Sequence, residues 1–194
     1  MELIYTMDNA ILITGFNGEI GRQTLLALSK KETLIIALDI NNPHIKYDNV
    51  IYIKDSILNK DVMKSIFNDY NIIEVYHFAA LLSQSANSNP KSAYEVNEEG
   101  SKLIIQLATN HGIKHKSFVR IFFPSSIAVY GPRKLKDAKE YDIIKPQTIY
   151  GCNKLAIEQF GTQKYEESIQ LGFGIDFRCL RFPGIISPYT IPSG

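Results

Sequence analysis

The sequence predicts an α/β fold built on a doubly wound parallel sheet, and three observations lead to this prediction. Short apolar runs alternate with helical patterns along the 194 residues. The helical patterns between most of these runs imply right-handed crossover connections. A glycine-rich turn directly follows the first apolar run and opens a helical pattern. Together they favour parallel strands whose faces are both covered by helices.

The individual elements follow from the spacing of apolar residues. Strands are expected at residues 10–14, 34–39, 50–54, 72–78, 118–123 and 174–180. Helices are expected at residues 22–30, 59–70, 90–111 and 149–171. Pro90 suits the first turn of the third helix, and Gly112 is expected to cap its end.

The turn after the first strand predicts a dinucleotide site. It reads Thr14-Gly15-Phe16-Asn17-Gly18-Glu19-Ile20-Gly21, with glycines at every third position. Glycines allow a sharp turn and a close approach to phosphates, and the start of the helix attracts their negative charge. By itself the pattern is also compatible with a glycine loop that only makes a tight turn.

Asp39 strengthens the nucleotide interpretation. It ends the apolar run Leu34–Asp39, close to the ~20-residue offset at which such folds place a ribose-binding carboxylate. A carboxylate accepts hydrogen bonds from the ribose hydroxyls and repels a 2′-phosphate. The sequence therefore favours NAD over NADP as the cofactor.

Composition and charge exclude several other classes of protein. Hydrophobic residues make up 45% of the chain, and 21 basic residues nearly balance 20 acidic ones, for a net charge of +1. This balance indicates neither a nucleic-acid partner nor a membrane surface. We expect no signal peptide or membrane span, and reduced cysteines. The histidines and cysteines show no metal-ligand spacing, so no metal is predicted, and His77 is interpreted as a packed core residue.

Tyr150 and Lys154 predict acid–base chemistry. Four residues apart on a helix, they share one face, and an ammonium group favours the phenolate form of a nearby tyrosine. The strand-end pair Ser125-Ser126 could supply a hydroxyl that orients a substrate alcohol. These groups suit hydride transfer at a carbon that bears a hydroxyl.

These motifs resemble the extended short-chain dehydrogenases/reductases, the NAD-dependent epimerase/dehydratase family with a Rossmann fold. The matching segments, in chain order, are the glycine turn, Asp39, Asp55, His77-Phe78-Ala79-Ala80, Asn97, Ser125-Ser126, Val129-Tyr130-Gly131, Tyr150-x-x-x-Lys154 and Arg181-Phe182-Pro183-Gly184. The resemblance implies that Tyr150 is the general base, Lys154 its partner and ribose anchor, and Ser126 the catalytic hydroxyl, with Ser125 as the fallback.

The resemblance also implies a set of cofactor-binding residues. They are Gly15, Asn17, Gly18, Ile20, Asp39, Asp55, Ile57, Phe78, Ala79, Ala80, Asn97, Ser125, Tyr150, Lys154, Phe182, Gly184 and Ile185. Asp55 and Ile57 would lie near the adenine, and residues 182–185 near the nicotinamide.

Three stretches, at residues 79–83, 124–132 and 180–187, resemble the short-chain type of L-threonine 3-dehydrogenase within this family. That branch oxidises the threonine hydroxyl to give 2-amino-3-oxobutyrate, and the resemblance places Ser83, Ser126 and Tyr150 near the amino-acid substrate. A nucleotide-sugar epimerase or dehydratase remains open as an alternative. So does an inactive NAD-binding fragment or regulator.

The family's chains continue well beyond the equivalent of Gly194. Residues 1–180 are therefore interpreted as the NAD-binding domain, and residues 181–194 as the start of a truncated substrate-binding region. The family resemblance suggests a homodimer packed through two long helices. A cytoplasmic location is expected, with a mitochondrial one left open.

Overall fold

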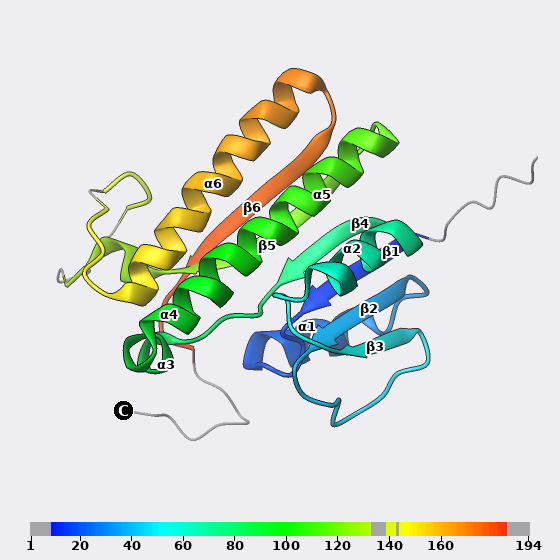
Figure 1. The fold of residues 1–194 in the computed structure, drawn as a ribbon, viewed down its shortest axis with the longest axis horizontal. Coiled ribbons are helices and arrows are strands. Elements are labelled where there is room, and N and C mark those ends of the chain that lie inside the picture. Colours follow the sequence, from blue (N-terminus) through cyan, green and yellow to red (C-terminus); the bar gives the residue numbers. More distant parts are fainter. Residues whose placement is uncertain (1–8, 133–138, 143, 186–194) are drawn as a thin grey trace, which may run out of the picture.

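The sheet at the centre of the molecule is parallel throughout. The computed structural model describes residues 9–132, 139–142 and 144–185 (Figure 1). The strands are β1 (Asn9–Thr14), β2 (Leu34–Asp39), β3 (Val50–Lys54), β4 (Asn71–His77), β5 (Phe118–Ser126) and β6 (Gly174–Phe182). They form one sheet in the order β3-β2-β1-β4-β5-β6. The order reverses between β1 and β4, which makes the crevice there the topological switch point. The predicted doubly wound parallel sheet is confirmed.

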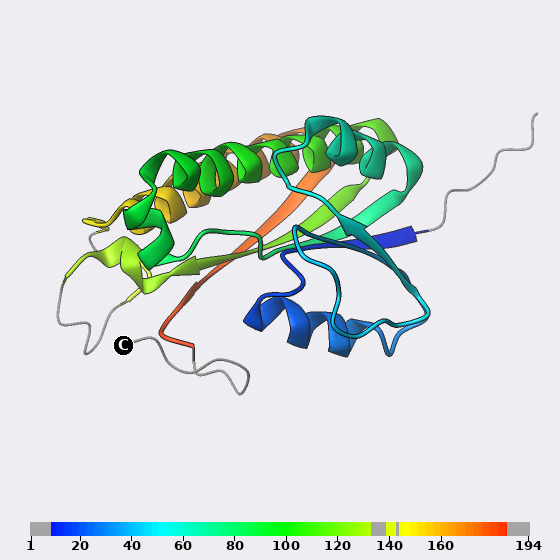
Figure 2. The ribbon, with the colours of Figure 1, turned by 60° about the horizontal axis from the view of Figure 1, so that its bottom comes forward.

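Helices lie on both sides of this sheet. They are α1 (Glu19–Leu28), α2 (Lys60–Asp69), α3 (Ser83–Ser88), α4 (Pro90–Ala93), the π-helix η1 (Tyr94–Gly100), α5 (Ser101–His115), the 3-10 helix η2 (Ile127–Tyr130) and α6 (Ile149–Leu171). Figure 2 shows α2, α5 and α6 on one face and α1 on the other.

Side chains along β1 point alternately to the two faces of the sheet and contribute to two separate hydrophobic cores. Ala10 and Leu12 face the side of α2, α5 and α6, where they join a large buried cluster. Ile11 and Ile13 face the opposite side and pack in a smaller cluster with Leu25 of α1. The strand is therefore apolar at nearly every position, as expected for a parallel strand buried on both faces.

The expectation that helices cover both faces is wrong for part of the sheet. Within the described residues, no helix lies over the β5 and β6 half of the face on which α1 packs (Figure 2). We call this half of the sheet the open face. It carries an ion row in which Arg120 bridges Glu74 and Asp176, at 2.6 and 3.6 Å. Beside the row lie aromatic rings, with Phe122 contacting Tyr76 and Phe182.

The helix expected at residues 90–111 differs in two ways from the prediction. It is divided by the π-helix η1, and it runs on to His115, where Lys116 adopts a left-handed conformation at the C-cap. Gly112 is thus not the cap. It lies buried inside α5. A side chain does not fit at this position, because a Cβ there would come within 2.0 Å of the Gly174 carbonyl oxygen. This glycine allows α5 to pack closely against the start of β6.

Other boundaries differ by a few residues. α1 begins at Glu19 rather than at residue 22, because the glycine turn leads directly into the helix. β5 and β6 pair as far as Ser126 and Phe182, so Pro124 lies within the strand. Pro124 is tolerated there because β4 pairs with β5 only as far as Phe122, so that beyond this residue one side of β5 is a free edge. The division of domains at residues 180 and 181 stays a prediction, and β6 extends across it.

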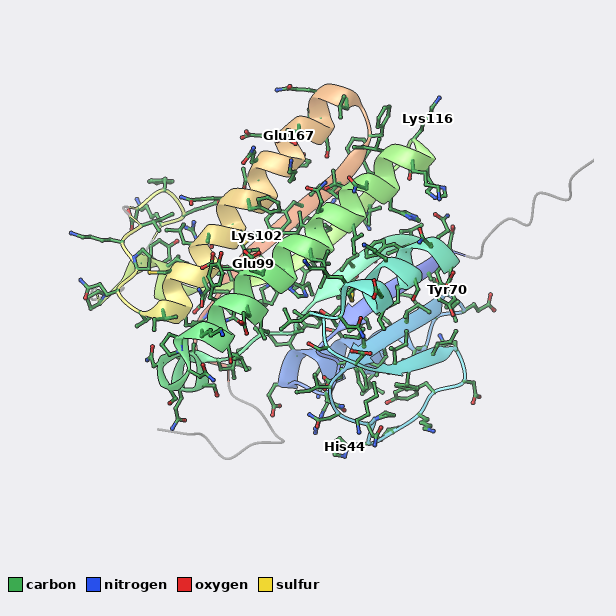
Figure 3. The ribbon with its side chains drawn as sticks, viewed as in Figure 1. His44, Tyr70, Glu99, Lys102, Lys116 and Glu167 are labelled. Atoms are coloured by element: carbon green, nitrogen blue, oxygen red, sulfur yellow. The ribbon has the colours of Figure 1, made fainter. Side chains whose placement is uncertain are left out.

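The outer surface of the helical layer is charged. Lys102 on α5 lies 3.5 Å from Glu98 and 3.4 Å from Glu99, and Figure 3 shows Lys102 and Glu99 together on this surface. Glu167 of α6 bonds Lys164 at 2.7 Å. The homodimer through these two long helices stays a prediction.

His77 is a buried hydrogen-bonding bridge at the centre of the sheet. Its Nδ1 lies 2.6 Å from the Thr14 hydroxyl of β1, and its Nε2 lies 2.8 Å from the Ser101 hydroxyl of α5. A neutral imidazole donates at one nitrogen and accepts at the other, which satisfies both bonds. Burial lowers the pKa of His77 to about 3, and the nearby Lys154 ammonium adds to the effect. The interpretation as a packed core histidine is confirmed.

This depressed pKa predicts acid sensitivity. The unfolded chain binds a proton at His77 below about pH 6.5, whereas the folded chain does not until about pH 3. The free energy of unfolding should therefore decrease as the pH is lowered from about 6.5 to about 3. This one group accounts for about 1.4 kcal/mol per pH unit. Denaturant unfolding between pH 7 and 4 measures the loss, and NMR should show a neutral His77 ring at pH 5. His44→Asn, at an exposed position, is the control; a His77 ring that titrates near pH 6.5 would contradict the assignment.

Candidate functional site

A cleft of about 570 Å³ opens at the carboxyl ends of β1, β2, β3 and β4. Its walls come from the glycine turn, from the ends of β2 and β3, and from the segment after β4. The sequence-predicted cofactor residues that line it are Gly15, Asn17, Gly18, Asp39, Asp55, Ile57, Phe78, Ala79 and Ala80. The cleft is also lined by residues that the sequence did not predict, namely Arg22, Leu38, Ile40, Asn41, Asn42, His44, Ser56, Leu81 and Val96. Arg22 could have been predicted from the sequence, since it directly follows Gly21, the last glycine of the turn.

The glycine turn is shaped by close backbone contacts. Gly15 has a φ of 71°, and a Cβ on it would meet the Ala79 nitrogen at 2.5 Å. A Cβ on Gly21 would meet the Gly15 carbonyl oxygen at 2.3 Å. Gly18 is the N-cap of α1 and provides no capping side chain. The helix therefore begins at the cleft with its positive dipole end, an arrangement that suits an anion such as a pyrophosphate.

Asp39 is held in a fixed orientation at the end of β2. Its Oδ2 accepts a hydrogen bond from the Asn17 amide at 3.0 Å, and its Oδ1 accepts one from the Asn41 amide at 2.9 Å. The Asn17 side chain donates to the carbonyl oxygens of Asn41 and Asn42. A carboxylate has about four acceptor positions, so Asp39 keeps capacity for the hydroxyls of a ribose.

Asp55 and Ile57 form the far wall of the cleft. The Asp55 carboxylate accepts hydrogen bonds from the Ser56 amide at 2.6 Å and from Asn59 Nδ2 at 3.0 Å. Ile57 is buried and packs against Gly100, where a Cβ would come within 2.6 Å of its Cδ1. Asp55 thus orders the turn after β3, and Ile57 supplies an apolar surface of the kind that a nucleobase requires.

Asn97 lies behind the cleft instead of lining it. Its Oδ1 accepts from the Leu81 amide at 2.7 Å, and its Nδ2 donates to the Leu81 carbonyl at 3.0 Å. Asn97 therefore fixes the backbone of a residue that does line the cleft. It sits in the π-helix η1, and such single-turn irregularities are frequent at functional sites.

The residues predicted to carry chemistry lie at the end of β5 and the start of α6. Lys154 is buried, and its Nζ donates to the Pro124 carbonyl at 2.7 Å. The same Nζ lies 5.4 Å from the centroid of the Tyr150 ring. Ser126 caps η2 by accepting a hydrogen bond from the Ala128 amide at 3.2 Å. η2 and α6 touch directly, since a Cβ on Gly151 would come within 2.6 Å of the Ala128 carbonyl.

Burial dominates the electrostatics of this group. It lowers the pKa of Lys154 to about 8, with Cys179 and, to a smaller extent, the Glu158 carboxylate acting in the opposite direction. It also raises the pKa of Tyr150 above its usual value of 10. The expectation that Lys154 lowers the tyrosine pKa is therefore wrong for the chain by itself, because desolvation of the phenolate raises that pKa.

The remaining predicted residues have less defined surroundings. Ser125 is buried beside Ser126, and its hydroxyl has no hydrogen-bond partner among the described residues. Phe182 contacts Phe122 at the end of the sheet, and Ile20 is half-buried on α1. Ser83, Gly184 and Ile185 are exposed.

The described part of the chain offers neither a metal-binding cluster nor a membrane-spanning helix. No group of three or more His, Cys, Asp or Glu residues there could hold a metal ion. Nor does any helix among those residues have the length and apolar character needed to cross a membrane.

Comparison with known proteins identifies the family. The model of the NAD-dependent epimerase/dehydratase family matches residues 11–194, which is nearly the whole chain. The chain belongs to the NAD-dependent epimerase/dehydratase family. NAD binding is expected for members of this family.

Individual relatives in the epimerase/dehydratase family agree with this assignment. The mitochondrial L-threonine 3-dehydrogenase of Bos taurus is 32% identical over 189 residues, which are 95% of this chain and 48% of that protein. An uncharacterized epimerase/dehydratase of Staphylococcus haemolyticus is also 32% identical, over 95% of this chain and 56% of its own length. The chain thus spans about half the length of the curated relatives it matches.

A solved structure gives the same result. The crystal structure of L-threonine dehydrogenase from Phytophthora infestans superposes with a TM-score of 0.79 at 31% identity, over 95% of this chain and 57% of that one. Members of the epimerase/dehydratase family with this degree of similarity therefore include dehydrogenases.

The burial of Tyr150 generates a prediction about its titration. In the cofactor-free chain, Tyr150 should form tyrosinate only above pH 10, because its pKa is raised by desolvation. Ultraviolet absorbance of the chain minus that of Tyr150→Phe isolates this one step. The matched control is Tyr141→Phe, at an 81% exposed position. A Tyr150 step below pH 10 would show that Lys154 prevails over burial.

Proposed function

We propose that the cleft binds NAD. The fixed Asp39 carboxylate faces it from β2, and the uncapped start of α1 faces it from the opposite side of the glycine turn. The two features match the ribose and the pyrophosphate of a dinucleotide. The apolar surface of Ile57 and the carboxylate of Asp55 then adjoin the adenine end.

The same ligand would extend along the ends of the strands toward Ser126. From β2 to β5 there are three strand spacings, or about 14 Å. A dinucleotide lies across the switch point in folds of this type. Its nicotinamide end would then lie near β5, where Tyr150 and Lys154 also lie. Lys154, buried and cationic, is the residue suited to bind the second ribose.

We further propose that the polypeptide carrying this chain oxidises the hydroxyl of L-threonine to give 2-amino-3-oxobutyrate. Bound NAD⁺ supplies the acceptor for the hydride that leaves the carbinol carbon. Ser126 donates a hydrogen bond that orients the reacting oxygen, and Tyr150 removes the hydroxyl proton as general base. Lys154 stabilises the tyrosinate once the positive charge of the nicotinamide is also present, since burial by itself opposes ionisation.

The observation that carries this proposal is the placement of Tyr150 and Lys154 against the strand end that bears Ser126. Lys154 reaches the residue two before Ser126, and the first turn of α6 contacts the 3-10 helix that Ser126 caps. Three groups that suit proton transfer at an alcohol are thus held by one packed junction.

The choice of threonine as substrate rests on further support. The relatives named L-threonine dehydrogenase are 31% and 32% identical to this chain. Leu81 lines the cleft, and the adjoining Leu82 and Ser83 are exposed at its rim. A small rim of this kind suits a compact amino acid, and a sugar diphosphate would require cations that this rim lacks. Epimerisation or dehydration of a nucleotide sugar is the alternative. The uncharacterized epimerase/dehydratase of Staphylococcus haemolyticus is consistent with the reaction class but not with any one substrate.

The NAD proposal predicts a preference set by Asp39. Calorimetry should show tighter binding of NAD than of NADP, and Asp39→Ala should weaken NAD binding by ~1–3 kcal/mol through lost charged hydrogen bonds. Asp69→Ala, at an exposed position on α2, is the control and should leave both affinities unchanged. Binding of NADP equal to or tighter than that of NAD in the unchanged chain would refute the role of Asp39.

The substrate proposal predicts NADH formation from L-threonine and little reaction with UDP-galactose. An absorbance assay at alkaline pH, where tyrosinate is favoured, measures the rate in the polypeptide that carries this chain. Tyr150→Phe should abolish turnover while NAD affinity stays nearly unchanged, and Lys154→Ala should reduce both. Conversion of a nucleotide sugar without NADH from threonine would favour the epimerase alternative. NAD binding without turnover of either substrate would favour an inactive NAD-binding protein.

A further inference from the structure

An ion pair outside the predicted site connects all the elements that carry the proposed chemistry. Arg181 of β6 bonds the Glu158 carboxylate of α6 through Nε at 3.0 Å and Nη2 at 2.7 Å. Both side chains are largely buried, at 18% and 11% exposure. A bidentate pair of this geometry fixes orientation as well as distance. It therefore locks the end of β6 to α6.

The same guanidinium extends the connection to the segment after Ser126. Arg181 Nη1 donates to the Tyr130 hydroxyl at 2.8 Å and to the Glu140 carbonyl at 2.9 Å. The Tyr130 ring lies under the guanidinium, 4.9 Å from its central carbon. Tyr130 ends η2, which Ser126 caps at its other end. The Arg181 side chain thus connects β6 with η2, which Ser126 caps, and with α6, which carries Tyr150 and Lys154.

We infer that Glu158 and Arg181 are positioning residues for the Ser126, Tyr150 and Lys154 group, and that Glu158 keeps the buried Lys154 charged. This inference rests on the proposed function for the meaning of that group. The contacts of Glu158 and Arg181 do not depend on which alcohol is oxidised.

The charge role follows from what surrounds Lys154. Glu158 is one helical turn further along α6 and is buried, so its field is poorly screened. The other titratable groups around the lysine are Tyr150, His77, Cys179 and Arg181. Burial raises the pKa of Cys179 to about 12, and His77 and Tyr150 are neutral near pH 7. Glu158 is the carboxylate among these groups and favours the ammonium form of Lys154. Because the Arg181 guanidinium offsets part of its field, removing the Glu158 charge would leave Lys154 near a buried guanidinium that has lost its anionic partner.

The test combines a titration with kinetics. NMR of the Lys154 side chain, assigned by its loss in Lys154→Arg, measures the lysine titration in the unchanged chain and in Glu158→Gln. The glutamine keeps the size and one acceptor oxygen but removes the charge, so the pKa of Lys154 should fall from about 8 by about one further unit. Arg178→Gln, which breaks an exposed ion pair with Asp176 on the same strand, should leave the titration unchanged. An unchanged Lys154 titration in folded Glu158→Gln overturns the inference.

A second variant covers the case in which Glu158→Gln does not fold. Tyr130→Phe removes one hydroxyl and keeps the ring, so it loosens η2 without leaving a buried charge. It should lower kcat about tenfold, which is less than the ~100-fold loss that a 1 Å misplacement of a reacting group can cause, while KM for NAD changes little. Unchanged kcat in Tyr130→Phe overturns the positioning role. The titration of Lys154 does not require turnover. If threonine is not the substrate, the titration result therefore still stands, and the two proposals can fail independently.

Discussion

The site depends on one close approach of two backbones at the centre of the sheet. The turn after β1 lies against the segment after β4, so that Gly15 leaves no room for a Cβ beside Ala79. These two strands flank the switch point, and their ends diverge from it. The contact sets the depth of the cleft, the place where α1 begins and the path of the chain toward Leu81. His77 and Thr14, bonded side by side just below, hold the same two strands together.

Most of the fold was predictable because parallel α/β structure has a strong periodic signal. The strands at Leu34–Asp39 and Val50–Lys54 and the helix at Ile149–Leu171 have the predicted bounds. The sequence does not predict α3, since Ser83–Ser88 has five polar residues and a single apolar one, Ala86, and therefore no apolar period. The role of Gly112 was misjudged for another reason. A glycine near a helix end usually caps it, and only the position of Gly174 reveals that this one serves packing.

The candidate site was predictable where a motif specifies backbone and charge together. The glycine turn and Asp39 lie in the cleft as expected, because their roles depend on strand ends that the sequence also predicts. Asn97 was assigned to the ligand, whereas its amide bonds Leu81, a contact sixteen residues away that no local pattern encodes. The raised pKa of Tyr150 likewise depends on burial, which comes from packing against neighbouring elements and not from the spacing of two residues.

The open face divides the molecule into halves of unequal protection. In the described chain, β1 and β2 contribute side chains to the buried clusters on both sides of the sheet, so that opening either strand exposes two cores. β5 and β6 have one such core, and their other surface holds the ion row and the aromatic rings. Backbone amides in that half should therefore exchange with solvent through smaller local openings than those of β1 and β2. The cofactor half would then be the more protected part of the sheet, and the end of β6 would depend on the Arg181–Glu158 pair to keep its position.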